Sequence, residues 1–532
     1  MSAETTSNVV ERMKGRGAGA DRPRVVFRTD WKRATRRLIV GGLCAVTAAS
    51  LTFPSAAMAA EWVNVGGNHY DAAAGDETWS WDGANDMQLK GYNGGSIEAA
   101  GRLDLTYEGD NTVTNGNGEG ISVVNGVNES AELNITGGAS DSLTVDATSD
   151  AIESEGDINI SGDGTITSTA SLGDGIDAEG NLTISGSGTV NATGSSDGIE
   201  VGGNATIDTS GSVTASSDQS SGMQVDGALS VTDSTLVATG TCEGLYVYKG
   251  VTFDHATVKV AARNPGNEAF GLFTDEDDIV IRNGSVVEAF AEGAYSAGIY
   301  TQNCEVDGVG GAGGHMFVSE SVVKAVARYL EGEGQDGGDI AMNYASSDVD
   351  GDEQLGRNAG IVVVTKNGMS PAKLSIVRST VTAEGDTAAI LVYAMSEDGS
   401  VAGMIELEGS IIQTPAGGHV SDYNAKYEGR NGVVEYDVGQ TIGLSGETIT
   451  SLNSADIAKS AVIAPEEVPV PAPSGSSTSG GANVTQATAR KASVAGSAIP
   501  QTGDASLAGV LSAGFAGLAA LVSGLFVSRK RG

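Results

Sequence analysis

Three stretches of the chain repeat one pattern: residues 150–160 read DAIESEGDINI, residues 174–184 read DGIDAEGNLTI, and residues 197–207 read DGIEVGGNATI. The Asp that opens each unit recurs after 24 and then 23 residues, and looser copies follow at intervals of 22 to 27 residues. Within each unit apolar residues alternate with polar ones, which predicts short strands with one buried face. Because no unit contains the roughly dozen residues of 3.6-residue periodicity that a helix needs, we expect the units to stack as coils of a parallel β-solenoid.

The expected fold class is therefore all-β: a right-handed parallel β-helix over residues 60–463. An array of immunoglobulin-like sandwiches is the alternative, but modules of about 100 residues do not match the short repeat. Three tryptophans, Trp62, Trp79 and Trp81, lie near the start of this range, so we expect a cap at about 60–95 that covers the first coil. A Gly- and acid-rich segment at about 303–357 is expected to leave the solenoid as a loop insertion.

The chain has 532 residues and is strongly acidic, because 68 Asp and Glu residues against 30 Lys and Arg residues give a formal charge of −38. Nucleic-acid binding needs a basic surface, so this charge excludes nucleic acid as a partner. With 40% hydrophobic and 18% charged residues, the chain is too apolar for disorder throughout.

Residues 1–59 are typical of a secretory signal peptide. A basic segment precedes the apolar run 38–53, and small residues follow that run. Ala57 and Ala59 form an A-x-A exit, so we expect cleavage after Ala59, which leaves Ala60 as the first residue of the mature chain. The apolar run is shorter than the roughly 20 residues of a membrane-spanning helix.

The C-terminal end combines a short motif, an apolar segment and a basic tail. The motif is Ile499-Pro500-Gln501-Thr502-Gly503; an uncharged segment, 505–527, and the basic residues 529–531 follow it. A helix over 505–527 is long enough to span a bilayer. Residues 464–498, which precede the motif, are rich in Pro, Ser and Gly and predict a disordered linker.

This tail resembles the LPxTG sorting signal of Gram-positive surface proteins, with Ile499 in place of the usual Leu. The resemblance implies that a sortase cleaves between Thr502 and Gly503 and joins Thr502 to peptidoglycan. It also implies a secreted protein held in the cell wall, on the extracellular face, with residues 464–498 as a wall-spanning linker. The alternative is an ordinary tail anchor that stays in the membrane.

The repeats at 150–215 also resemble secreted bacterial β-helix proteins described as carbohydrate-binding. That resemblance implies a right-handed β-helix with calcium sites and a polysaccharide ligand. The repeats themselves predict columns of carboxylates when they stack: Asp150, Asp174 and Asp197 in one column, and Glu153, Asp177 and Glu200 in another. Like charges at such spacing repel, and calcium binds through carboxylate oxygens, so these six residues are candidate calcium ligands. The alternative is that they point into water at turns.

No residue pattern for catalysis is present, since the four His residues are scattered and form no metalloprotease or nucleophile motif. We therefore expect an adhesin-like protein that binds polysaccharide or a host glycan, with calcium as the expected cofactor. A polysaccharide-degrading enzyme on the same fold and a passive coat or spacer protein remain alternatives.

Overall fold

The computed structural model describes residues 60–127, 129–303, 305–306, 309–310, 314–330, 358–365, 372–386, 388–394, 404–414, 419–429, 432–441, 448–449 and 460–466. All of them belong to the first of two units of the chain, residues 1–467. These residues form strands and turns without a helix, and so hold none that is long and apolar enough to cross a membrane. The predicted signal peptide and sorting signal lie outside the described residues, and so does the predicted linker apart from residues 464–466.

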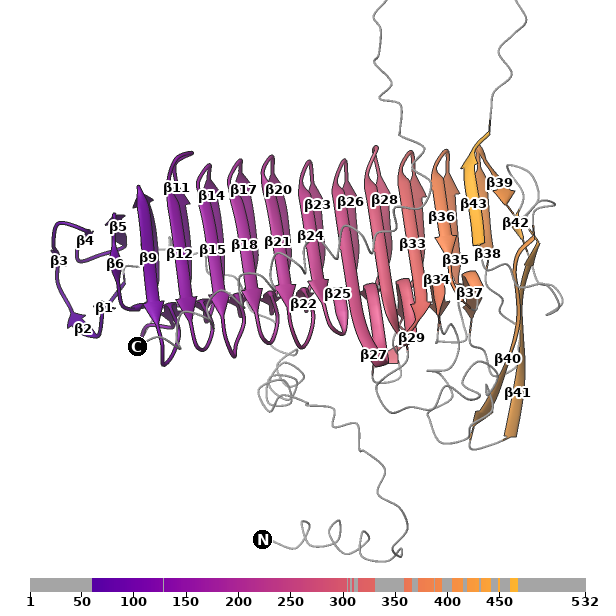
Figure 1. Ribbon diagram of the computed structural model, residues 1–532, viewed down its shortest axis with the longest axis horizontal. Coiled ribbons are helices and arrows are strands. Elements are labelled where there is room, and N and C mark those ends of the chain that lie inside the picture. Colours follow the sequence, from indigo (N-terminus) through magenta and orange to yellow (C-terminus); the bar gives the residue numbers. More distant parts are fainter. Residues whose placement is uncertain are drawn as a thin grey trace, which may run out of the picture. The chain divides into compact units, whose positions relative to one another are not determined.

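Three columns of parallel strands make up the stack in Figure 1. Each repeat adds one strand to each column, and equivalent residues of successive repeats pair in register, as Ile152, Ile176 and Ile199 do. Paired strands lie about 4.8 Å apart. The recurring sequence is thus converted into rows of side chains that cross the repeats.

We name the columns by their order within a repeat. The short column contains β7 (Ile97–Ala100), β10 (Ile121–Val124), β13 (Ile152–Ser154), β16 (Ile176–Ala178), β19 (Ile199–Val201), β22 (Met223–Val225), β25 (Glu243–Val247), β34 (Ala359–Thr365) and β37 (Ala388–Ala394). The first long column contains β5 (Asp86–Lys90), β8 (Arg102–Glu108), β11 (Glu132–Gly137), β14 (Asp157–Gly162), β17 (Leu182–Gly186), β20 (Ala205–Thr209), β23 (Leu229–Thr232), β26 (Val251–Asp254), β28 (Ile279–Arg282), β32 (Met316–Ser319), β35 (Lys373–Val377) and β38 (Met404–Glu408).

The second long column contains β6 (Asn93–Gly94), β9 (Asp110–Asn115), β12 (Ser142–Ala147), β15 (Thr165–Ala170), β18 (Thr189–Gly194), β21 (Ser212–Ser217), β24 (Thr235–Gly240), β27 (Thr257–Thr274), β29 (Val286–Asn303), β33 (Val322–Tyr329) and β36 (Thr380–Glu384). Strands β27 and β29 continue past this column and also pair within the short column. The two columns therefore belong to one sheet, and the first long column forms the other.

Both ends of the stack change to antiparallel pairing. At the start, β1 (Trp62–Val65) pairs with β2 (Asn68–Tyr70) and β7, and β4 (Trp79–Trp81) pairs with β3 (Ala74–Gly75) and β5. At the other end, β43 (Ser460–Pro465) pairs with β36 and β39 (Ser410–Thr414), and β42 (Thr448–Ile449) pairs with β38. Two further hairpins are β30 (Glu305–Val306) with β31 (Val309–Gly310), and β40 (His419–Gly429) with β41 (Gly432–Thr441). Such ends cover sheet edges that would otherwise recruit other strands.

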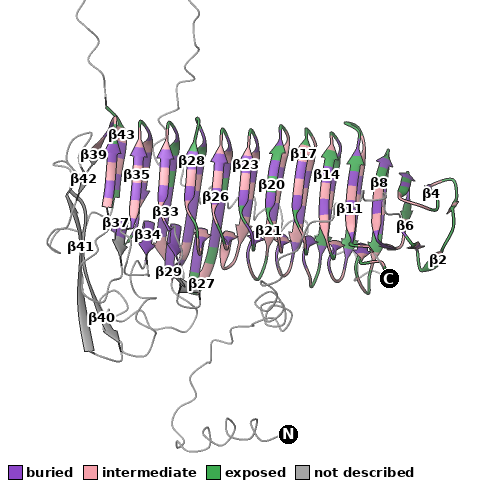
Figure 2. Ribbon diagram, turned by 180° about the vertical axis from the view of Figure 1, so that it is seen from behind, coloured by how far each residue is buried: buried purple, intermediate pink, exposed green. Residues whose placement is uncertain are grey.

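One hydrophobic core runs through the stack between the columns. Buried and less buried residues alternate along the long strands, as Figure 2 shows. In β18, for example, Val190 and Ala192 are buried, whereas Thr189 and Asn191 are half-buried. The apolar alternation of the sequence supplies this core, because every second side chain of a strand points to the same face.

Glycine is required where the first long column turns into the second. Gly162 and Gly186 have φ values of 94° and 93°, a conformation that favours glycine. A Cβ on Gly186 would also lie 2.3 Å from the backbone oxygen of Gly162. The turns of neighbouring repeats therefore stack backbone against backbone.

The predictions of an all-β class and of parallel stacking of the repeats are confirmed. The predicted loop insertion at 303–357 was wrong for residues 316–329, which form β32 and β33. These strands pair in register with β28 and β29 on one side and with β35 and β36 on the other. The physical reason is that residues 316–329 keep the apolar alternation of a strand, with Met316, Val318, Val323 and Ala325 buried. The range 60–95, for which the sequence predicts a cap, contains β1–β6 with Trp79 and Trp81 buried.

Candidate functional site: stacked carboxylates beside the short column

A ladder of aspartates lies at the turn that precedes the short column. The backbone N–H of Asp174 donates to Oδ1 of Asp150 at 2.7 Å, and the N–H of Asp197 donates to Oδ1 of Asp174 at 2.5 Å. The N–H of Ser221 continues the ladder by donating to Oδ1 of Asp197 at 2.8 Å. Each carboxylate therefore satisfies a backbone donor of the next repeat, and all three are buried, with Asp197 at 0% exposure.

The second predicted column lies three residues further along each repeat. Glu153, Asp177 and Glu200 are the middle residues of β13, β16 and β19 and pair in register. Because their neighbours in each strand point into the core, these three side chains point to the opposite face. Asp177 is nevertheless only 3% exposed, whereas Glu153 and Glu200 on either side of it are half-buried.

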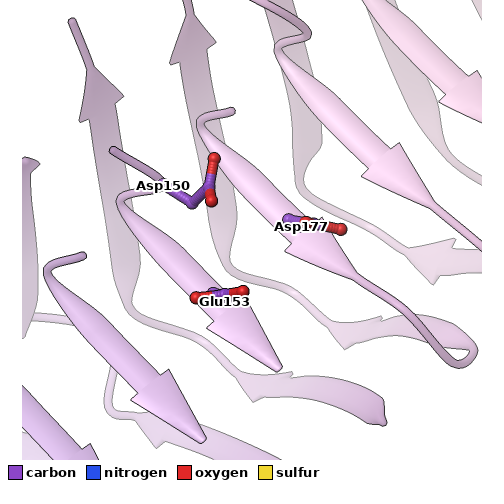
Figure 3. Close-up of side chains that lie close together, drawn as sticks. All are labelled: Asp150, Glu153 and Asp177. Atoms are coloured by element: carbon purple, nitrogen blue, oxygen red, sulfur yellow. The ribbon is translucent and has the colours of Figure 1, made fainter. Parts of the chain in front are cut away.

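The two columns approach closely enough to share a cation. Carboxylate oxygens of Asp150, Glu153 and Asp177 lie within 4.8 Å of one another (Figure 3), and so do those of Asp174, Asp177 and Glu200. We call these sets the first and second triads. Asp177 belongs to both, which joins them into one continuous acidic site. The structure thus brings together five of the six predicted ligands. Asp197 belongs to neither triad and is linked to the site by the hydrogen bond from its backbone N–H to Asp174.

Negative charge at this site is poorly balanced by the protein. Burial is the main reason why the pKa of Asp174 rises to about 9. The charges of Glu200 and Asp197 raise the pKa of Asp174 further, and the Asp197 N–H opposes them. From residue 103 to residue 248 the chain contains no Lys, Arg or His, so neighbouring repeats offer no cationic side chain. A proton or a bound cation is what remains to neutralise the site.

An asparagine ladder on the other side of the short column shows what the fold itself requires. The N–H of Asn181 donates to Oδ1 of Asp157 at 2.7 Å, and the N–H of Asn204 donates to Oδ1 of Asn181 at 2.9 Å. The geometry repeats that of the aspartate ladder, although two of these positions are uncharged. An amide oxygen is therefore sufficient for the ladder, and the charges at Asp174 and Asp197 exceed the structural need.

Sequence reasoning missed how the outward row of the short column continues. Gln224 follows Glu200 in register, and then Tyr246, Phe273 and Tyr300 occupy the same position. The three rings pack in series, with centroids 5.4 Å and 5.2 Å apart. The signal was available, because each of the three aromatic residues follows the Gly-Leu or Gly-Ile pair that marks its repeat. The row thus changes from acidic to aromatic along the stack.

The other predicted site residues fall outside the described part of the chain. They are Ala57 and Ala59 of the predicted cleavage site and the sorting motif Ile499–Gly503. Ala60, the expected first residue after cleavage, is the first described residue and is buried.

Comparisons with known proteins found no matching family model, no matching curated protein and no matching solved structure.

Proposed function

We propose that this chain is a secreted protein of a Gram-positive cell wall that displays a right-handed parallel β-helix and binds polysaccharide or host glycans with the help of calcium. The observation that carries the proposal is the in-register stack of parallel strands, which holds equivalent residues of successive repeats in rows at a fixed spacing. Its position between a signal-like segment and a sorting-like motif supports display outside the cell.

Covalent attachment to the wall is tested by mass spectrometry of protein released from purified cell wall by a peptidoglycan hydrolase. The proposal predicts a mature chain that begins at Ala60 and ends at Thr502 joined to a peptidoglycan peptide. Recovery of the protein in the membrane fraction with residues 503–532 still present would instead support the tail anchor.

Calcium fits the acidic site in its ligand chemistry. Calcium takes six to eight oxygen ligands, and each triad offers three carboxylates whose second oxygens and bound water can complete the set. A divalent ion would also offset the like charges that burial brings together. When bound, calcium would supply charge neutralisation at the turn and would couple neighbouring repeats through Asp177.

Calorimetric titration of calcium into the secreted chain tests this part of the proposal. Asp177→Asn removes the charge shared by both triads and is expected to lower calcium affinity at least tenfold. Asp157→Asn is the matched control, because it removes one charge from the asparagine ladder, outside both triads. Equal affinities for the two variants, or no calcium binding by the wild-type chain, would contradict a calcium site here.

Glycan binding is tested by retention of the protein on a panel of immobilised polysaccharides, with and without a calcium chelator. The proposal predicts retention on at least one polysaccharide and reduced retention in chelator. Release of unsaturated sugars from the panel would identify a polysaccharide-degrading enzyme. A protein that binds none of them, nor host cells, would be a coat or spacer.

A further inference from the structure

The outward face of the second long column is free of charge over four successive repeats. We call this surface, built from β15, β18, β21 and β24, the hydroxyl face. Its outward residues are Thr165, Thr167, Thr169, Thr189, Asn191, Thr193, Ser212, Thr214, Ser216, Thr235, Val237 and Thr239. All of them except Asn191 and Val237 carry a hydroxyl group. They form three rows, because register partners in adjacent strands lie directly beside one another.

The hydroxyl groups of this face make few side-chain hydrogen bonds among the described residues. Among the described residues, the one side-chain hydrogen bond on the face joins Thr193 and Ser216 at 3.0 Å. All twelve side chains are half-buried or exposed. A hydroxyl group both donates and accepts hydrogen bonds. The face therefore offers a regular array of donors and acceptors to a partner.

The fold does not require this lack of charge. The row that runs through Thr214 and Val237 continues in register as Lys259, Glu288 and Lys324. Lys259 and Glu288 form an ion pair there, with Nζ 3.2 Å from the carboxylate. Charged side chains are thus accommodated one repeat beyond the hydroxyl face. Their absence over four repeats, in a stretch whose only ionised side chains are acidic, sets this face apart from its surroundings.

We infer that the hydroxyl face binds a neutral, extended polysaccharide that lies across the strands. This inference rests on the proposed glycan-binding function and names the surface and the ligand class. Repeats about 4.8 Å apart match the length of roughly one sugar ring in an extended chain, so successive sugars can meet successive members of one row. An acidic polysaccharide is disfavoured, because residues 103–248 contain carboxylates and no cationic side chain.

The test measures retention of the full secreted chain on immobilised neutral β-glucan and neutral xylan, with polygalacturonate as the acidic comparison, each with calcium and with a calcium chelator. The variant Thr167→Lys with Thr214→Lys places two long charged side chains on the hydroxyl face, two repeats apart. The matched control, Thr183→Lys with Ser230→Lys, adds the same charge at the same spacing on the outer surface of the first long column. Thermal unfolding followed by circular dichroism establishes that both variants fold.

The inference predicts that the wild-type chain binds a neutral polysaccharide, that the hydroxyl-face variant loses at least tenfold in affinity, and that the control variant changes less than twofold. Equal losses in the two variants would overturn the hydroxyl face as the binding surface. Binding to polygalacturonate alone, and only with calcium, would overturn it and leave the proposed function standing. Binding to no polysaccharide under any condition would overturn both.

Discussion

Asp174 helps to hold the fold through one oxygen, but its carboxyl group has to take up a proton when the chain folds at neutral pH. Its Oδ1 accepts the N–H of Asp197, whereas its burial among carboxylates raises its pKa to about 9. Asp174→Asn keeps the acceptor and folds without this proton uptake. In a calcium-free buffer at pH 8 we expect the free energy of unfolding of this variant to be about 2 kcal/mol higher than that of the wild type.

Chemical denaturation measures this difference, and Asp174→Ala provides the control. The alanine variant loses the acceptor as well as the charge, so it should be about 1–3 kcal/mol less stable than the asparagine variant. An asparagine variant less stable than the wild type would contradict a carboxyl group that has to take up a proton on folding.

The raised pKa of Asp174 also sets a dependence of stability on pH. Because the folded state holds the proton up to about pH 9 and the unfolded state releases it near pH 4, the folded state binds more protons between these values. The free energy of unfolding should therefore fall as pH rises from about 4 to about 9 in chelator. Asp174→Asn should remove much of that slope in denaturation curves recorded across this range. A wild-type stability that rises with pH over the range would contradict the assignment.

Two buried threonines break the apolar pattern of the short column. The hydroxyl groups of Thr274 and Thr301 are buried and have no hydrogen-bond partner among the described residues. Val247 precedes them in register and Val363 follows. We expect Thr301→Val to raise the free energy of unfolding by about 1 kcal/mol, because valine fills the same space without a buried hydroxyl.

The reverse exchange, Val247→Thr, is the control for the threonine prediction. It buries a new hydroxyl at the equivalent position and should lower the free energy of unfolding by about 1–3 kcal/mol. Both changes are measured by denaturant unfolding. Destabilisation by Thr301→Val would indicate that its hydroxyl has a partner, such as a bound water.

At this scale the sequence could predict which residues share a column, because the repeat aligns them. Asp150, Asp174 and Asp197 were found in this way. The sequence could not tell that each carboxylate accepts the N–H of the next repeat, since that depends on the exact path of the turn. It also gave no reason to expect that Asp177 is buried, because alternation alone places it on the outward face.

Each strand is held in position mainly by pairing with the equivalent strands of the adjacent repeats. Residues 150–173 and residues 174–196 form successive repeats with matching ladder positions, and Gly173 would lead into Asp197 as it now leads into Asp174. Deleting residues 174–196 should therefore give a protein that folds cooperatively, with a midpoint of thermal unfolding close to that of the wild type.

Deleting only residues 174–185 is the control for the repeat deletion. This change removes part of a repeat, so later strands would lose their register and expose apolar side chains. We expect the shorter deletion to abolish cooperative unfolding in circular dichroism melts. Similar melting of the two variants would contradict stacking in register.

The strands were predictable as short alternating segments, but two features of the later repeats were not. Strands β27 and β29 run through the bend between columns without a break, and Ala262 and Ala291 pack there in a small separate cluster. Strands β32 and β33 were hidden within a Gly- and acid-rich range whose composition is typical of a loop. Composition was a poor guide where alternation persisted over only a few residues.

Across the whole stack, charge is distributed unevenly. Residues 103–248 carry carboxylates without a cationic side chain, whereas later repeats join opposite charges across neighbouring strands, as Arg282 does with Asp254 and Arg378 with Glu320. The earlier repeats therefore place the acidic site and the hydroxyl face in one stretch of chain. The net charge was evident from composition, but this division appears only when the repeats are aligned.

The central claim, that the repeats stack in register, is tested most directly by distances between spin labels on the first long column. Spin-labelled cysteines are introduced at Asn134 and Thr252 in one protein and at Asn134 and Ser375 in another, after the native cysteines are changed to serine. These pairs lie five and eight repeats apart in the column. With about 4.8 Å for each repeat, pulsed electron resonance should give narrow distributions near about 24 Å and about 38 Å. Broad distributions, or equal distances for the two pairs, would contradict the stack.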